Sequence, residues 1–158
     1  MGELFASVFR SSDLKFSVLK LDCGASGFGE KINQDGQTAQ HRKDFASGQQ
    51  NLKKLFNAGV NVGFGTDSGA QPGGIPGFSE HRELELMVDA GLTPLQAITS
   101  ATGQNAKLLH LQDRGSIAVG KRADLLVLDA DPLVDIRNTR NIVAVYHDGR
   151  SIADLPGK

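Results

Sequence analysis

The sequence predicts an α/β protein, and two features of the chain support this class. Residues 40–56 carry apolar side chains at helical spacing, and Gly59 follows where a left-handed residue would end the helix. Residues 60–64 then alternate between apolar and small or polar side chains, as in a short strand, so helix, tight turn and strand form half of a parallel α/β unit. Later, residues 125–128 and 142–146 form apolar runs typical of strands.

The first 40 residues carry weaker patterns than the rest of the chain. Residues 14–21 alternate in part, which favours a strand. Four glycines among polar residues between positions 24 and 36 predict a loop.

Three helices are predicted between residues 79 and 109. Ser79 is expected to be the N-cap of the first, with Glu80 favourably placed in its first turn and Gly91 at its end. Thr93 begins the second helix with a capping-box pattern, and Thr102 is expected to cap a third.

After Leu111 the chain changes character, because glycines interrupt it and β-type runs replace helical ones. Residues 147–150 have the composition of a hairpin turn. We therefore predict a boundary near residue 112, with a helical α/β part over residues 1–111 and a small β part over residues 112–158.

Composition excludes several classes of function. The formal net charge of −1 provides no basic surface for nucleic acid or for an anionic membrane. No apolar stretch approaches the roughly 20 residues of a membrane helix, and residues 1–10 lack a leader pattern. Cys23 is the single cysteine, so no internal disulfide can form, and a reducing, cytoplasmic compartment is expected.

Asp67 is the strongest candidate for chemistry, because it follows the predicted strand 60–64 in a glycine-rich turn. The carboxyl ends of parallel strands are where α/β folds place catalytic groups. The residues alone leave three interpretations open: an Asp that bonds its own turn, a metal-site carboxylate, or part of a dinucleotide-binding loop. The last fits poorly, because about ten residues separate the glycines from the next helix, whereas a phosphate loop opens directly into one.

Several motifs, taken together and in this order, resemble the closing stretch of the amidohydrolase superfamily barrel. They are Phe-Gly-Thr-Asp-Ser-Gly at 64–69, His-Arg-Glu-Leu-Glu-Leu-Met at 81–87, and the segments 90–98 and 101–106. The tail, from Gly115 to Leu133, is similar to the C-terminal strands of the family's small β-sandwich. Among subfamilies the chain most resembles the imidazolonepropionase-related group, which includes prolidase-like members.

The resemblance implies a fold and an activity. Residues 1–111 would be the C-terminal fragment of a (β/α)8 barrel, and residues 112–158 would be strands of the sandwich. The chain would belong to a metal-dependent hydrolase of C–N bonds in small, dipeptide-like substrates, with a divalent metal, typically zinc. Asp67 would be both metal ligand and general acid/base, Gly65 and Thr66 would shape the site, and His81 would border the substrate.

The family's other metal ligands have no counterpart in this sequence. No His-x-His pair is present, and the four histidines are His41, His81, His110 and His147. The length of 158 residues is also short for a whole barrel, which usually needs roughly 250. An alternative is therefore a non-catalytic fragment that forms a homo-oligomer or complements a missing N-terminal half.

Overall fold

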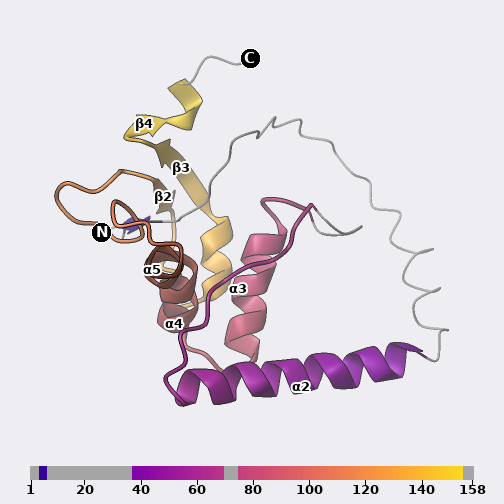
Figure 1. Ribbon diagram of the computed structural model, residues 1–158. Helices are drawn as coiled ribbons and strands as arrows, with labels where there is room; N and C mark the ends of the chain where they lie inside the picture. Colours follow the sequence, from indigo (N-terminus) through magenta and orange to yellow (C-terminus); the bar gives the residue numbers. More distant parts are fainter. Residues whose placement is uncertain (1–3, 7–36, 70–74, 155–158) are drawn as a thin grey trace, which may run out of the picture.

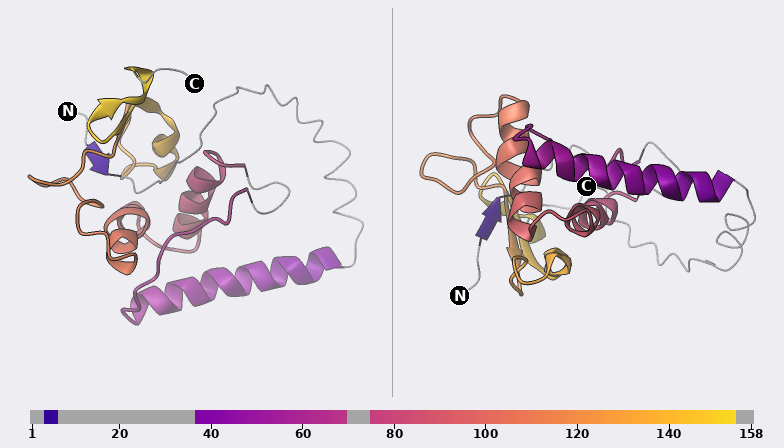
Figure 2. Two further views of the ribbon diagram at one scale, coloured as in Figure 1. Left: turned by 45° about the horizontal axis from the view of Figure 1, so that its top comes forward. Right: turned by 90° about the horizontal axis from the view of Figure 1, so that it is seen from below.

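The computed structural model describes residues 4–6, 37–69 and 75–154, and these form a helical layer next to a small sheet (Figure 1). Figure 1 and the left view of Figure 2 place helices α3, α4 and α5 between the long helix α2 and the sheet. The strand predicted over residues 14–21, the loop over 24–36 and Cys23 lie outside the described residues. Among the described helices, none combines the length and apolar character needed to cross a membrane.

Helix α2 runs from Gln37 to Asn57, which confirms the helix predicted in this region. Its end is a left-handed turn at Gly59, where φ is +74°. The Gly59 N–H donates to the Phe56 carbonyl and the Val60 N–H donates to the Leu55 carbonyl, both at 3.0 Å. This pair of bonds satisfies carbonyls that the helix end would otherwise leave free.

The strand predicted over residues 60–64 is wrong, because this segment is extended but joins no sheet among the described residues. A strand needs a neighbour to complete its backbone hydrogen bonds. Here side chains take that place: Asn105 bonds both the N–H and the carbonyl of Phe64, at 2.8 Å and 2.9 Å. The Ser100 hydroxyl donates to the Val62 carbonyl at 2.8 Å.

Helix α3 spans Ser79–Asp89, so the prediction of Ser79 as N-cap is wrong. Ser79 is already helical, and its N–H donates to the Ile75 carbonyl at 2.9 Å. The turn over residues 75–78 supplies this acceptor, so no side-chain cap is made. The predicted end at Gly91 is confirmed by a φ of +98°.

Helix α4, Pro94–Thr99, begins with the predicted capping box on Thr93. The expected third cap at Thr102 is wrong, because the helix continues through a π-helical turn η1, Ser100–Gln104, into α5, Asn105–Leu108. The Thr102 hydroxyl donates to the Ile98 carbonyl at 2.8 Å. It therefore bonds within the helix instead of capping a new one.

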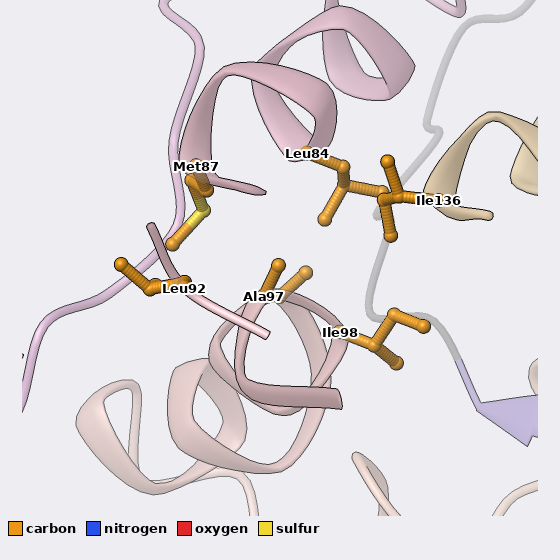
Figure 3. Packing of buried hydrophobic residues seen from close by; sticks show 7 residues of the cluster. Leu84, Met87, Leu92, Ala97, Ile98 and Ile136 are labelled. Carbon is orange, nitrogen blue, oxygen red and sulfur yellow. The ribbon is translucent and has the colours of Figure 1, made fainter. Parts of the chain in front are cut away.

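The hydrophobic core lies between α3, α4 and the short 3-10 helix η2, Ile136–Arg140 (Figure 3). Its buried members are Leu84, Met87, Leu92, Ala97, Ile98, Ala101 and Ile136. Phe56, Phe64 and others from α2 and the extended segment pack against this cluster from outside. One core thus joins the helices to η2, which precedes the last strands.

The sheet has four antiparallel strands in the order β1-β2-β3-β4. They are β1, Leu4–Ala6; β2, Leu125–Leu128; β3, Ile142–His147; and β4, Arg150–Ser151. The predicted strands at 125–128 and 142–146 are confirmed. The predicted hairpin is also confirmed, with positive φ at Asp148 and Gly149, and the chain then turns into the 3-10 helix η3, Ile152–Asp154.

A mixture of helices and strands is therefore present, as the α/β prediction requires. The described strands all belong to the antiparallel sheet, and no parallel barrel strand lies among them. The origin of residues 1–111 in a barrel, and the boundary near residue 112, remain predictions.

Candidate active site around Asp67

Asp67 lies in the turn that follows the extended segment. Its φ of +52° is in the left-handed region, which Asp tolerates better than most side chains. Asp67 is exposed, while Thr66 and Ser68 on either side are half-buried. The carboxylate is therefore the group that this turn presents to solvent.

The flanking side chains both bond the same partner, Glu80, in the first turn of α3. The Thr66 hydroxyl donates to Glu80 Oε1 at 3.2 Å, and the Ser68 hydroxyl donates to the same oxygen. Glu80 Oε2 accepts the N–H of Gly77 at 2.6 Å. Glu80 thus joins the Asp67 loop to the turn that leads into α3.

These donors determine the protonation of Glu80. Burial alone would raise its pKa, but hydrogen bonds from Ser68, from the backbone N–H groups of Glu80 itself and Gly77, and from Thr66 outweigh burial, so the pKa of Glu80 lies below its ordinary value. Glu80 is therefore a carboxylate, able to accept several bonds at once.

The interpretation of Asp67 as a carboxylate that bonds its own turn has no support among the described contacts. The Ser68 N–H bonds a side chain, but that side chain is Thr66, whose Oγ1 lies 3.2 Å away. The dinucleotide-loop interpretation is also disfavoured, because α3 begins only at Ser79. An outward-facing carboxylate is what a ligand-binding role requires.

His81 lies on α3 next to Glu80 but makes its contact in another direction. Its Nδ1 is 3.0 Å from the hydroxyl of Thr139, a buried residue of η2. The Thr139 hydroxyl donates to the Ile136 carbonyl at 2.9 Å, so Nδ1 carries the proton that Thr139 accepts. Nε2 then keeps its lone pair.

The pKa of His81 is lowered. Burial is the main cause and the positive charge of Arg140 adds to it, while Glu80 and Glu85 oppose the shift. Glu85 in turn pairs with Arg140 at 2.7 Å and with Arg82 at 2.8 Å. The structure therefore ties His81 and Glu85 to η2, and the expected contact of His81 with substrate stays a prediction.

The residues around Asp67 fit one ligand of a metal ion and not a complete set. An exposed carboxylate can supply an oxygen ligand, but catalytic zinc sites usually use three protein ligands. In the part of the chain that the structure describes, no group of three or more His, Cys, Asp or Glu side chains is placed to hold an ion.

The other three histidines lie outside this loop. His41, His110 and His147 are exposed, and Nδ1 of His147, at the β3–β4 hairpin, lies 3.1 Å from Oδ1 of Asp124, which precedes β2. Gly65 is also exposed, and a Cβ there would meet no atom within 4 Å, so space alone does not require glycine at this position.

Sequence reasoning missed the role of four residues: Glu80, Ser68, Asn105 and Thr139. Glu80 was expected only as a favourable first-turn charge. A hydroxyl on each side of Asp67 was a signal that a common acceptor could lie nearby, but the sequence did not say which carboxylate would fold against them.

Comparison with known proteins identifies the family. The model of the amidohydrolase family matches residues 13–152, most of the chain. This chain therefore belongs to the amidohydrolase family, which confirms the resemblance stated from its motifs.

Three relatives show how far the similarity extends. Imidazolonepropionase of Deinococcus deserti is 41% identical over 88 residues, which cover 55% of this chain and 22% of that protein. The 5-methylthioadenosine/S-adenosylhomocysteine deaminase of Bacillus thuringiensis is 36% identical over 118 residues, which cover 69% of this chain and 27% of that protein. The crystal structure of a Xaa-Pro dipeptidase with methionine bound in its active site superposes with a TM-score of 0.58 at 38% identity. The superposition covers 65% of this chain and 25% of the dipeptidase.

These matches cover only part of each relative. The chain spans between 22% and 27% of their lengths. What the complete relatives do is therefore not by itself a property of this chain.

Proposed function

We propose, from its place in the amidohydrolase family, that this chain forms the part of a metal-dependent hydrolase that carries the Asp67 carboxylate. The reaction is the hydrolysis of C–N bonds in small amide or dipeptide-like substrates. The observation that carries this proposal is the family match over residues 13–152 together with an exposed carboxylate in the loop at 66–69.

Asp67 has the chemistry that such a reaction needs. Its oxygens can bind a divalent cation, such as zinc, and can also take a proton from water and return it to a leaving amine. When bound, the metal lowers the pKa of water toward ~7 and polarises the scissile carbonyl. The hydroxyls of Thr66 and Ser68 are turned to Glu80, so they leave the Asp67 carboxylate available.

The substrate class follows from the relatives as a group. Their names refer to an imidazolonepropionase, a deaminase and a Xaa-Pro dipeptidase, so no single substrate is common to them. We therefore propose the class of C–N bond, with dipeptides as the first substrates to test. His81 is proposed to border the substrate, because its Nε2 can accept a hydrogen bond from an amide or amine.

The proposal is tested with tagless protein purified without chelators, assayed for bound metal and for hydrolysis of a dipeptide and N-acyl amino acid panel with added zinc. Wild type is expected to show zinc-dependent hydrolysis when it is mixed with an N-terminal half taken from a relative, which supplies the other metal ligands. Asp67→Asn should lower kcat by at least about 100-fold, since it removes a proton acceptor. Asp129→Asn, a change at an exposed aspartate that follows β2, is the matched control and should keep full activity.

Two results would overturn this function. Hydrolysis that persists in Asp67→Asn would remove Asp67 from the reaction. No hydrolysis and no bound metal in the wild type, both alone and together with the N-terminal half, would show that this chain is not part of a hydrolase.

A second candidate function is association with another polypeptide, either a copy of this chain or a complementary barrel segment. It is favoured by the segment 60–64, which is extended but pairs with no described strand. Val60 is 46% exposed, and an open cavity of about 290 Å³ lies between this segment, Phe56 and Leu95. Exposed extended backbone next to apolar side chains is a surface that strand pairing would cover.

Sedimentation over a concentration series tests this second candidate. Association that strengthens with concentration is expected. A monomer at every concentration, alone and after addition of an N-terminal half taken from a relative, would exclude it.

A further inference from the structure

Asp67 is held in its turn from both sides by one acidic residue. Thr66 and Ser68, its immediate neighbours, each donate a hydroxyl hydrogen bond to Glu80 Oε1. The backbone of Asp67, between them, is in the left-handed region, with φ of +52°. This conformation costs free energy in a residue other than glycine, and it persists where surrounding contacts impose it.

We propose that Glu80 is a positioning residue, which fixes Thr66 and Ser68 and thereby directs the Asp67 carboxylate out of the loop. This inference rests on the proposed function only in taking Asp67 as the working carboxylate. Glu80 does not contact substrate in this role; it acts through the loop.

Glu80 can do this because its own position is fixed. Leu84 and Met87 anchor α3 in the core. His81 bonds Thr139, and Glu85 pairs with Arg140, so two further residues of α3 are tied to η2. With α3 held in this way, the Glu80 carboxylate is a stationary acceptor for the hydroxyls of Thr66 and Ser68.

The role requires a carboxylate in particular. Glu80 accepts three bonds, two hydroxyls on one oxygen and the Gly77 N–H on the other. Gln has a single acceptor oxygen, and its NH2 group can only donate, so it cannot reproduce this set. The lowered pKa of Glu80 agrees with an ion that these donors stabilise.

A simpler role for Glu80 is favourable charge at the start of α3, where acidic residues stabilise any helix. Glu83 offers a matched comparison, because it is a half-buried glutamate in the same helix that makes no hydrogen bond to the loop among the described contacts. Any effect of Glu80 that comes from the loop should be absent at Glu83.

The first experiment measures amide hydrogen exchange by NMR in the metal-free full chain. Glu80→Gln should speed exchange about tenfold at Gly77, whose N–H bonds Glu80, and at Ser68, whose N–H bonds the Thr66 hydroxyl that Glu80 holds. Exchange in the middle of α3 should stay unchanged, which separates a loosened loop from an unfolded helix. Glu83→Gln should leave exchange at Ser68 and Gly77 as in wild type.

A reciprocal experiment tests the same contact from the loop. Ser68→Ala removes one donor but leaves α3 untouched, so the pKa of Glu80, followed by carboxyl carbon NMR, should rise toward its ordinary value. A residue that serves only the helix would keep its pKa. If wild type hydrolyses a substrate, Glu80→Gln should lower kcat about tenfold with little change in KM, as for a misplaced catalytic group.

The outcomes separate this inference from the proposed function. Faster exchange at Ser68 and Gly77 in Glu80→Gln alone, together with the rise in the Glu80 pKa, supports the positioning role even if the chain hydrolyses nothing. Unchanged exchange in Glu80→Gln, or an unchanged Glu80 pKa in Ser68→Ala, overturns it even if Asp67 proves essential for activity.

Discussion

Two segments of this protein, residues 60–64 and strand β2 at Leu125–Leu128, both have sequences that predict a strand, but only β2 is paired in a sheet. Strand β2 pairs with β1 on one side and with β3 on the other. Segment 60–64 pairs with no described strand, and side chains of η1 and α5 complete part of its backbone bonding. A sequence typical of a strand therefore favours an extended backbone. Whether that backbone forms the hydrogen bonds of a sheet depends on whether another strand lies beside it.

The side-chain hydrogen bonds that replace a neighbouring strand at segment 60–64 have a specific geometry. Asn105 bonds both polar groups of Phe64, as an adjacent strand residue would. Gly63 permits this approach, because a Cβ there would lie 3.0 Å from the Asn105 side-chain oxygen and 2.8 Å from Leu108. Gly63 and Asn105 thus work as a pair that fixes the segment leading to Asp67.

The largest effect is expected from Asn105→Ala, which leaves the N–H and carbonyl of Phe64 without these partners. Chemical denaturation should show a loss of about 2 kcal/mol in the free energy of unfolding, from two partly buried hydrogen bonds. Asn61→Ala, at an exposed position of the same segment, is the control and should change stability by less than about 0.5 kcal/mol. Equal losses in the two variants would mean that Asn105 does not replace a strand neighbour.

A smaller effect is expected on association, if segment 60–64 is covered by another polypeptide. Val60→Lys places a charge beside the unpaired backbone, where lysine discourages strand pairing. Sedimentation should show association weakened about tenfold, or roughly 1.4 kcal/mol.

Val143→Lys gives the matched comparison in the sheet. Val143 is 62% exposed on β3, which is already paired with β2 along this stretch. The same charge should therefore leave association unchanged there. If both variants dissociate the protein equally, the contact surface does not centre on segment 60–64.

Much of the fold could be predicted from local signals. Gly59 and Gly91 end helices, Thr93 and Gln96 form a capping box, and residues 147–150 make a hairpin, because each depends on residues a few positions apart. The predictions that Ser79 and Thr102 cap helices were wrong for a related reason. Both can cap a helix in isolation, but the preceding turn in one case and a continuous helix in the other removed the need.

The candidate site was predictable only in part. Asp67 could be singled out from its turn and its family resemblance, but Glu80 and Thr139 could not. Glu80 lies 12 and 14 residues from its loop partners, and Thr139 lies 58 residues from His81. Such contacts are set by how α3 packs, and no local spacing in the sequence encodes them.

The smallest effect expected is a pH dependence from the contact between α3 and η2. The pKa of His81 lies below its ordinary value of 6.5, because burial and Arg140 disfavour the charged ring. The unfolded chain therefore binds this proton more tightly than the folded protein does, and protonation favours unfolding. The contribution of His81 should be fully present above about pH 6.5 and lost as the pH falls through its folded pKa.

His81→Gln should remove this dependence, since its amide can still donate to Thr139 but does not titrate. The measurement is the free energy of unfolding of both proteins from pH 8 to pH 5. This range lies mostly above the pKa values of carboxylates, so their titration contributes little. His41→Gln, at an exposed position of α2, should keep the wild-type slope. A slope that survives in His81→Gln would assign the titration to another group, whereas its loss would show that the helix carrying Glu80 is held to η2 through a neutral histidine.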